Sequence, residues 1–509
     1  MIASLRHFTR LVQIFWTLAR HDALFPLRTA GVAPGLVNAA EMFRRRGVPG
    51  RPGQRLARAL EELGPTFIKF GQVLSTRADL LGDEAAEDLS SLQDRLPPFS
   101  GVEAKAIIAR ELDAPVDQLF ASFDEQPVAA ASIAQVHFAV TSEGTPVAVK
   151  VLRPGIERAF TRDLDLMRWI ARKMERRAEY RRLRPLEVIR TFEEAVRVEM
   201  DFRLEAAAAD ELAQNFANDP DYRVPTVDWR RTARRVFTLA RIEGIPIDEV
   251  ARIRSAGFDP EDIVRKAAEI FFKQVFRDGF FHADQHPGNL FVGLDGAVVA
   301  VDFGIMGRLD QKTRRYLGEM LSAFLQRDYR RVAEVHFEAG YVPEHKSVDA
   351  FAQACRAIAE PIFDRPQNEI SVARLLAQLF QITETFEMET QPQLLLLQKT
   401  MLVAEGVGRR LAPQANMWAL AQPLVDTWRR EYMGPEVQLL EAAHQVMHGI
   451  TRLPKIADDI ERIRRDGLRI DPESFRRASE MQRSAGGRRV RLNVYFLIAA
   501  ALLVILYLI

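Results

Sequence analysis

Two short apolar runs in this sequence each end in a charged residue, and a polar loop stands between them. Residues 147–150 read Val-Ala-Val-Lys and residues 299–302 read Val-Ala-Val-Asp. The loop, residues 282–289, reads His-Ala-Asp-Gln-His-Pro-Gly-Asn. A strand can hold an ammonium group over phosphate oxygens, and carboxylate and amide oxygens are the usual ligands of Mg²⁺. The pattern therefore predicts one site assembled from two strand ends and a loop.

The charged and polar residues of these segments occur in the order found in protein kinases. Lys150 corresponds to the strand lysine, Asp284 and Asn289 to the catalytic loop, and Asp302 to the Asp-Phe-Gly motif. Singly, each has an ordinary explanation, because solvated lysines and loop-capping aspartates are common. Together they predict an ATP site in which Lys150 binds phosphates, Asn289 and Asp302 bind Mg²⁺, and Asp284 faces an acceptor hydroxyl or a water.

A kinase core also needs a glutamate that pairs with the strand lysine. The helical pattern from Pro185 to Ala209 offers five acidic candidates, Glu193, Glu194, Glu199, Asp201 and Glu205. An acidic helix face is usually only solvated, and spacing does not choose among the five.

No glycine-rich phosphate loop precedes Lys150. The corresponding segment consists of Val128, Ala129, Ala130, Ala131, Ser132, Ile133, Ala134, Gln135 and Val136. Its backbone amides can cradle phosphates, but alanine adopts positive φ less readily than glycine. We expect this alanine-rich loop to be stiffer than a glycine-rich one and to bind nucleotide differently.

The order of helical and strand patterns predicts an α+β protein with a two-lobed, protein-kinase-like fold, an N-terminal helical extension and a C-terminal transmembrane helix. Residues 1–120 look helical and form the extension. Residues 121–250 form the N-lobe, with strands expected over Pro127–Val140, Thr145–Leu152 and Arg235–Ile242. Residues 251–485 form a mainly helical C-lobe and C-terminal extension, interrupted by a short strand pair near 290–301.

Residues 492–509 are almost wholly apolar. A helix of that length spans about 27 Å, close to the roughly 30 Å of a bilayer's hydrocarbon core. Arg488, Arg489 and Arg491 precede it and would stay on the cytoplasmic side. We expect a single-pass anchor in the inner (cytoplasmic) membrane, with the catalytic part in the cytoplasm.

The opposite end of the chain predicts an amphipathic helix. Its apolar residues at helical spacing are Leu5, Phe8, Leu11, Val12, Phe15 and Leu18, and arginines lie on the other side. Packing on the protein itself and lying at a membrane surface both stay open.

The amino-acid composition limits the kinds of partner and the cellular compartment that we expect. Seventy basic and 69 acidic residues leave a formal charge of +1, so nucleic acid is not expected as a partner. The single cysteine, Cys355, excludes an intramolecular disulfide and favours a reducing compartment.

Four motifs in order resemble the UbiB family of atypical kinases, which support ubiquinone (coenzyme Q) biosynthesis. The motifs are Lys69-Phe70-Gly71-Gln72, the alanine-rich loop, Glu199-Met200-Asp201 and the catalytic loop. They cover roughly residues 55–310, and the leucine run at 394–397 is a weaker likeness. Bacterial relatives often carry two spanning segments, whereas this sequence offers one.

The resemblance implies a role for the extension that spacing does not provide. Lys69 and Gln72 would lie on helices that occlude the place where kinases bind peptide, with Lys69 contacting Glu199 and Asp201.

The resemblance also implies the roles of the core residues. Glu205 would pair with Lys150, Asp284 would be the catalytic aspartate, and Asn289 and Asp302 would hold the metal. The implied activity is Mg-ATP binding with slow hydrolysis, or phosphorylation of a small molecule. Membrane lipids, prenylated phenolic quinone precursors and other quinone-biosynthesis proteins are the implied partners.

Two other functions stay open. An ordinary protein or small-molecule kinase shares the spacing of the catalytic loop, although the Lys69 motif and the alanine-rich loop argue against it. A nucleotide-binding pseudokinase could serve as a scaffold for a biosynthetic complex, although every catalytic side chain is present.

Overall fold

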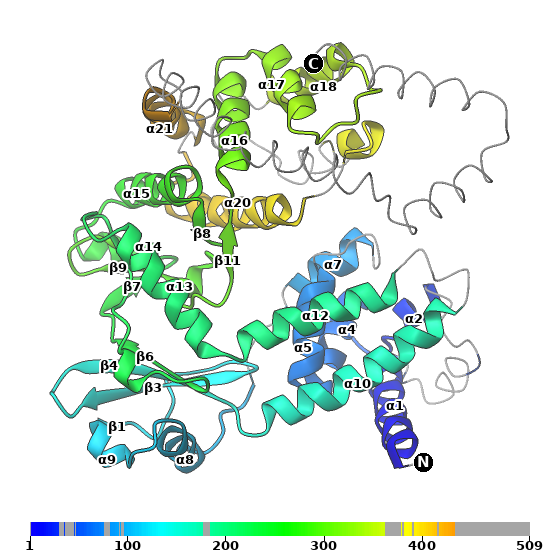
Figure 1. The fold of residues 1–509 in the computed structure, drawn as a ribbon, viewed down its shortest axis with the longest axis vertical. Coiled ribbons are helices and arrows are strands. Elements are labelled where there is room, and N and C mark those ends of the chain that lie inside the picture. Colours follow the sequence, from blue (N-terminus) through cyan, green and yellow to red (C-terminus); the bar gives the residue numbers. More distant parts are fainter. Residues whose placement is uncertain are drawn as a thin grey trace, which may run out of the picture. The chain divides into compact units, whose positions relative to one another are not determined.

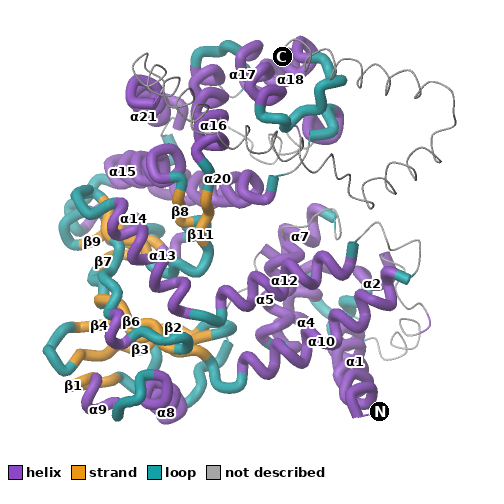
Figure 2. Tube along the Cα trace, viewed as in Figure 1, coloured by secondary structure: helices purple, strands orange, loops and turns teal. Residues whose placement is uncertain are grey.

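The computed structural model describes residues 2–29, 47–75, 82–90, 96–176, 184–361, 381–388, 391–414 and 417–432, together with residues 35, 45, 92 and 378. The chain divides into two compact units, Met1–Trp428 and Arg429–Ile509, and nearly all described residues belong to the first (Figure 1, Figure 2). No helix among the described residues is long and apolar enough to cross a membrane. The predicted spanning segment, 492–509, lies outside the described residues.

The first lobe contains an antiparallel sheet with the strand order β1-β3-β4-β6, and β2 pairs with β3. The strands are β1 (Phe120–Phe123), β2 (Ala129–Ala130), β3 (Ala134–Thr141), β4 (Pro146–Leu152) and β6 (Val236–Ala240). The expected hairpin of β3 and β4 and the later strand β6 are confirmed. The continuous strand predicted over Pro127–Val140 is wrong, because the chain bends between β2 and β3. Strand β1 was not predicted.

Alternation along β4 separates the core of this lobe from its outer face. Val147, Val149 and Val151 are buried with residues of α8 (Gly101–Glu111). Successive side chains of a strand point to opposite faces, so Lys150 lies on the other side of the sheet. The same three valines that pack the sheet on α8 therefore direct Lys150 away from the core.

Three helices follow β4: α10 (Ile156–Glu175), α12 (Pro185–Glu199) and α13 (Phe202–Asn215). The single helix predicted from Pro185 to Ala209 is wrong, because the chain breaks before α13. The Asp201 carboxylate accepts the Arg203 N–H and caps α13. The Phe202 N–H donates to the Arg234 carbonyl, and the Phe202 ring is fully buried. These contacts orient α13 independently of α12.

The N-terminal helices are α1 (Ile2–Arg20), α2 (Phe25–Thr29), α4 (Pro52–Leu63), α5 (Pro65–Ser75) and α7 (Asp83–Ser90). Helices α4, α5 and α7 pack on one another, and α5 also contacts α10 and α12. Arg10 fastens α1 to α10, since its Nε and Nη2 each donate to a carboxylate oxygen of Asp163 at 2.9 Å. Arg10 Nη2 also donates to the Leu63 carbonyl at 3.0 Å, which joins α1 to α4.

The orientation of α1 reverses part of the expected pattern. Arg10 is buried, whereas Phe8, Val12 and Trp16 are 64%, 51% and 51% exposed. The prediction that the arginines lie opposite the buried face is therefore wrong for Arg10. The bidentate pair with Asp163 provides the physical reason, because it holds this rotation of the helix.

The second lobe contains two small sheets. One has the strand order β5-β10-β9-β7 and the other pairs β8 with β11. The strands are β5 (Tyr222–Arg223), β7 (Gly244–Pro246), β8 (Phe280–His282), β9 (Leu290–Gly293), β10 (Val298–Ala300) and β11 (Met306–Arg308). The strand pair predicted near 290–301 is confirmed as β9 and β10, and the other pairings were not predicted.

Helices make up the remainder of this lobe. They are α14 (Val250–Ser255), α15 (Pro260–Phe272), α16 (Gln311–Leu325), α17 (Tyr329–Glu338), α18 (Val348–Ala359), α20 (Pro392–Leu411) and α21 (Met417–Tyr432). Helix α20 contacts both α15 and β11, so a segment far along the chain lies beside the β8–β11 pair, and β8 leads into the catalytic loop (Figure 1).

Candidate active site

Lys150 lies between two carboxylates. Its Nζ is 2.7 Å from Glu205 Oε1 and 3.2 Å from Asp302 Oδ1. The Lys150 and Glu205 side chains are 15% and 8% exposed, whereas that of Asp302 is 50% exposed. Strand β4, the first turn of α13 and the segment after β10 thus bring together three groups that are distant in the sequence.

The charges in this cluster shift one another's pKa values. Desolvation opposes the charge on Lys150, but the Asp302 and Glu205 carboxylates raise its pKa above the usual value. Desolvation also opposes ionisation of Asp302, yet Lys150, with a contribution from Lys69, holds the pKa of Asp302 well below its usual range. Burial raises the pKa of Glu205 to about 7 against the attraction of Lys150. The site therefore combines an ammonium and a carboxylate that stabilise each other's charge with a second carboxyl group whose ionisation is opposed by burial.

Among the five acidic candidates, Glu205 is the one that pairs with Lys150. Glu193 and Glu194 pair with arginines of α10 and α12. Because Asp201 caps α13, Glu205 stands in the first turn of that helix. Reading Asp201 as a helix N-cap would have separated Glu205 from the acidic residues of the preceding helix.

The loop after β8 is organised by the buried His282. Its backbone N–H donates to Gln274 Oε1 at 2.9 Å. Its ring Nδ1 accepts the Asp284 N–H, and its Nε2 donates to the Val301 carbonyl, each at 3.2 Å. His282 is therefore the neutral Nε2–H tautomer, and burial lowers its pKa. This ring ties the backbone of Asp284 to the strand that leads to Asp302.

Asn289 closes the same loop. Its Nδ2 donates to the Asp284 carbonyl at 3.0 Å, and its own carbonyl accepts the Val301 N–H at 2.9 Å. The Asp284 carboxylate has His286 Nε2 at 3.8 Å and Lys399 Nζ at 3.7 Å. Lys399 belongs to α20 and was not predicted from the sequence.

Asp302 has an unusual backbone conformation. Its φ is +61°, in the left-handed region that residues with a Cβ rarely adopt. The next residue, Phe303, is buried and meets the His282 ring edge-on with 5.6 Å between ring centroids. Burial of this neighbouring ring holds Asp302 in the strained conformation, and its Oδ1 faces Lys150.

The donor set fits a divalent cation that arrives with nucleotide phosphates. The described residues contain no group of three or more His, Cys, Asp or Glu side chains suited to a metal. Asp302 offers a half-exposed carboxylate. Asn289 uses its Nδ2 to hold Asp284, which makes its Oδ1 the amide atom suited to a cation. These are the oxygen ligands that Mg²⁺ prefers.

Arg153 holds the alanine-rich loop. Its Nε donates to the Ala131 carbonyl at 2.9 Å, and its backbone N–H donates to the Ile133 carbonyl at 2.8 Å. Its Nη1 reaches the Pro97 carbonyl at 2.9 Å, and the Ala131 N–H donates to the Ala134 carbonyl at 2.8 Å. The loop is therefore tied to its surroundings as well as stiffened by its composition. Arg153 was not predicted from the sequence.

Gln135 points to the opposite face of the sheet. Its side chain bonds both the N–H and the carbonyl of Phe99, at 2.9 and 3.1 Å, and lies 2.8 Å from His137 Nε2. Val136 pairs with Lys150 across the strands and shares its face, so the neighbouring Gln135 faces the other way. The Gln135 side chain therefore lies away from the Lys150 cluster, and the prediction for this segment concerns its backbone amides.

Lys69 joins the extension to the site. Its Nζ is 3.0 Å from Glu199 Oε2 at the end of α12, and both side chains are mostly buried. Gln72 is partly buried further along α5. Asp201, the other expected partner of Lys69, forms an ion pair with Arg203, whose Nη2 lies 2.6 Å from Asp201 Oδ2.

Gly71 allows close packing within this motif. A Cβ at this position would come within 2.5 Å of the Leu92 side chain and 2.6 Å of the Leu60 side chain. A larger residue would therefore require the Leu92 and Leu60 side chains to move.

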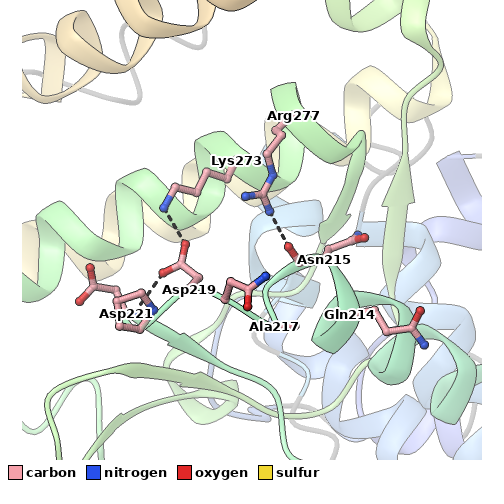
Figure 3. A pocket seen from close by; sticks show the side chains of 9 residues that line it. Gln214, Asn215, Ala217, Asp219, Asp221, Lys273 and Arg277 are labelled. Atoms are coloured by element: carbon pink, nitrogen blue, oxygen red, sulfur yellow. Dashed lines mark hydrogen bonds and ion pairs between the residues drawn. The ribbon is translucent and has the colours of Figure 1, made fainter.

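A polar hollow of about 330 Å³ lies at the other end of α13 (Figure 3). No predicted site residue lines it. Lys273 Nζ is 2.6 Å from Asp219 Oδ2, and Arg277 Nη2 donates to the Asn215 carbonyl at 2.9 Å. These bonds tie the end of α13 to the π-helix η2 (Lys273–Asp278), which leads into β8. The helix that carries Glu205 is thereby fastened to the segment that carries the catalytic loop.

The fold and the Lys150 cluster define an α+β protein of the kinase-like class, which confirms the predicted core architecture. Residues 91–336 match the ABC1 atypical kinase-like domain, and residues 355–416 match the UbiB helical domain. The chain is 48% identical over 388 residues to "Probable protein kinase UbiB" of Marinobacter nauticus, covering 75% of this chain and 71% of that protein. This chain therefore belongs to the UbiB family of atypical kinases.

Two further comparisons agree with this result. "Probable protein kinase UbiB" of Pseudomonas paraeruginosa is 42% identical over 468 residues, which is 90% of this chain and 88% of that protein. The solved structure of the Rv3197–erythromycin complex from Mycobacterium tuberculosis has a TM-score of 0.51 and 25% sequence identity, and the match covers 78% of this chain and 98% of that one. The shared family and the shared fold extend over most of this chain.

Proposed function

We propose that this protein binds Mg-ATP at the cluster of Lys150, Glu205 and Asp302 and releases or transfers the terminal phosphoryl group beside Asp284. The observation that carries this proposal is the position of Lys150 Nζ, 2.7 Å from Glu205 Oε1 and 3.2 Å from Asp302 Oδ1. A lysine–glutamate pair next to a metal-binding aspartate is the arrangement that a kinase core requires.

The contacts of each side chain support its part in this reaction. Glu205 would hold Lys150 while its ammonium binds phosphate oxygens. Asp302 and Asn289 would hold Mg²⁺, which neutralises phosphate charge when bound. Asp284 would accept the proton of the attacking hydroxyl or water, because His282 and Asn289 hold its backbone while its carboxylate stays partly exposed.

The extension supports a small acceptor. Lys69 lies 3.0 Å from Glu199 and contributes to the charge environment of Asp302, so α5 stands close to the nucleotide site. Helices in this position disfavour a folded protein substrate and favour water or a small molecule.

We infer ubiquinone biosynthesis as the cellular role, because the family to which this chain belongs supports that pathway. Prenylated phenolic quinone precursors are the acceptors to test first, with membrane lipids and other quinone-biosynthesis proteins as neighbours. The apolar segment 492–509 would anchor the chain in the inner membrane, with the catalytic part on the cytoplasmic side.

The proposal is tested by measuring ATP turnover of the full chain with and without anionic liposomes and a phenolic quinone precursor. Asp302→Asn should weaken the thermal stabilisation caused by Mg-ATP, because a ligand charge is lost. Asp284→Asn should keep that stabilisation and lower turnover by about 100-fold or more. Unchanged stabilisation in Asp302→Asn, or unchanged turnover in Asp284→Asn, would contradict the assigned roles.

The products separate the alternatives. Free phosphate alone indicates an ATPase, and a phosphorylated precursor indicates a small-molecule kinase. Labelled protein would instead indicate an ordinary protein kinase, and binding without any turnover would indicate a pseudokinase scaffold.

The anchor has a separate test. Removal of residues 488–509 should move the protein from the membrane fraction to the soluble fraction, because the apolar segment is lost. A truncated protein that still resists alkaline extraction would assign membrane attachment to another part of the chain, with the N-terminal helix the first candidate.

A further inference from the structure

Helix α20 docks directly on the catalytic loop. Thr400 is fully buried, and its hydroxyl donates to the Ala283 carbonyl at 3.2 Å, one residue before Asp284. The same hydroxyl lies 2.8 Å from the Leu396 carbonyl of its own helix. The hydroxyl has one proton, which these two carbonyls share, and its buried contact with the Ala283 carbonyl places α20 beside the loop.

This docking brings Lys399 to Asp284. Lys399 precedes Thr400, and its Nζ lies 3.7 Å from Asp284 Oδ1. The distance exceeds that of a hydrogen bond but keeps the two charges in electrostatic contact. The Lys399 side chain is 44% exposed, so its ammonium can turn toward a ligand without leaving a buried pair.

The other ammonium groups around the site are held more tightly. Lys150 has two carboxylates within 3.2 Å, and Lys69 lies 3.0 Å from Glu199. The catalytic loop itself, residues 284–289, contains neither lysine nor arginine. The loop has no cationic lysine or arginine of its own, and Lys399 supplies a cation beside the carboxylate of Asp284.

We propose that Lys399 is a further catalytic residue, whose ammonium binds the terminal phosphoryl group during its transfer. The inference rests on the proposed function. In the step, the acceptor oxygen forms a bond to the γ-phosphorus, the bond from that phosphorus to the bridging oxygen breaks, and ADP leaves. The acceptor proton passes to the Asp284 carboxylate, while Lys399 keeps its proton and stabilises the charge on the phosphoryl oxygens.

The test compares Lys399→Gln, Lys399→Arg and the parent as full chains. Binding of ADP and of a non-hydrolysable ATP analogue is measured with Mg²⁺, alongside steady-state turnover of ATP. We expect Lys399→Gln to lower kcat by about 100-fold. The same variant should weaken binding of the analogue by about tenfold while ADP binding changes less than about threefold, because ADP lacks the contacted phosphate. Lys399→Arg should recover at least a tenth of parental turnover.

Two variants on the same helix control for structural effects. Arg410→Gln also converts a cation to an amide, but Arg410 is mostly exposed and lies 4.0 Å from Asp248, so kcat and both affinities should stay at parental values. Thr400→Val removes the docking hydrogen bond and shows how displacement of α20 alone changes the thermal midpoint.

The outcomes distinguish this inference from the proposed function. If the parent binds and hydrolyses ATP while Lys399→Gln matches it in kcat and in analogue binding, Lys399 has no catalytic role. If Lys399→Gln shows the lowered midpoint of Thr400→Val, with equal losses for ADP and analogue and no recovery in Lys399→Arg, its role is structural. A parent that binds neither nucleotide overturns the proposed function and this inference with it.

Discussion

At the scale of single residues, the site depends on one ammonium group and two carboxyl groups whose surroundings differ. Lys150 is fixed by two carboxylates, and these two differ because Glu205 is enclosed by protein whereas Asp302 is half exposed. Burial raises the pKa of Glu205 to about 7, while Lys150 holds that of Asp302 below its usual range. Glu205 is therefore suited to positioning, and Asp302 is suited to holding a cation.

Glu205→Gln tests this division of roles. We expect turnover to fall by about tenfold or more, because Lys150 loses its positioning partner. At pH 8 the free energy of unfolding should change by less than about 2 kcal/mol, since the variant also removes the cost of a buried carboxylate and Lys150 keeps Asp302. Chemical denaturation and ATP hydrolysis, measured on the same preparation, show whether Glu205 mainly affects turnover or stability. A large loss of stability would show that Glu205 mainly supports the fold.

Ala131→Gly tests the stiffness of the alanine-rich loop. Loss of one methyl frees the backbone, so the amides should approach the phosphates and tighten Mg-ATP binding by several-fold, while quinone production in cells falls. Titration of the variant and the parent with Mg-ATP measures the effect. Weaker binding would mean that added backbone entropy dominates and that the alanines only fill space. Ala121→Gly, in β1 of the same sheet, is the matched control outside the loop.

At the scale of elements, the ends of helices determine where the functional residues lie. Asp201 begins α13 and places Glu205 in its first turn. Arg277 and Lys273 hold the other end of α13 beside η2 (Figure 3). Arg10 similarly decides which side of α1 is buried. Individual polar contacts, more than hydrophobic periodicity, therefore orient these helices.

Arg10→Met should reveal the strength of the contact between α1 and α10. Its buried partner Asp163 would keep the contact with Arg162, whose Nε lies 3.0 Å from Asp163 Oδ1, so we expect the free energy of unfolding to fall by about 1–3 kcal/mol. The control is Arg20→Met in the same helix, whose exposed pair with Glu62 at 3.5 Å should contribute less than about 1 kcal/mol. Urea denaturation of both variants measures the difference. Equal effects of the two substitutions would show that the buried pair has no special importance.

At the scale of the whole molecule, the candidate site collects groups from the extension, both lobes and α20. Each contribution arrives through its own contact: Lys69 through Glu199, Lys150 through Glu205, and Lys399 through the docking of Thr400. A substitution that alters any of these packing contacts is expected to move a charged group of the site.

The stability of the molecule should depend on pH through three enclosed histidines. Desolvation lowers the pKa values of His137, His282 and His336 from 6.5. As the pH falls through 6.5, these histidines take up protons more readily in the unfolded chain than in the folded chain. The free energy of unfolding therefore decreases with decreasing pH until the lowered pKa values of the folded state are passed. We expect the thermal midpoint to fall between pH 7.5 and 5.5. His137→Phe, which can keep the stacking on Phe123, should make this fall less steep, and an equally steep fall would assign it to other groups.

The sequence by itself determined the order of the chemical groups, the β3–β4 hairpin and the family. These depend on local patterns, because strand alternation, turn residues and the spacing within the catalytic loop are properties of neighbouring residues. The motifs alone thus led to Lys150, Asp284, Asn289 and Asp302 as one set.

Only the tertiary structure decided which residues lie beside that set. Spacing left five acidic candidates equal, the family resemblance named Glu205, and the position of α13 brings Glu205 to Lys150. The motif window included Gln135, but the pleat of β3 turns its side chain to the other face. Arg153 and Lys399 carry no local signature, since their importance comes from contacts with chain segments far away in the sequence. Such contacts depend on how whole elements pack, and hydrophobic period and residue spacing contain no direct record of that packing.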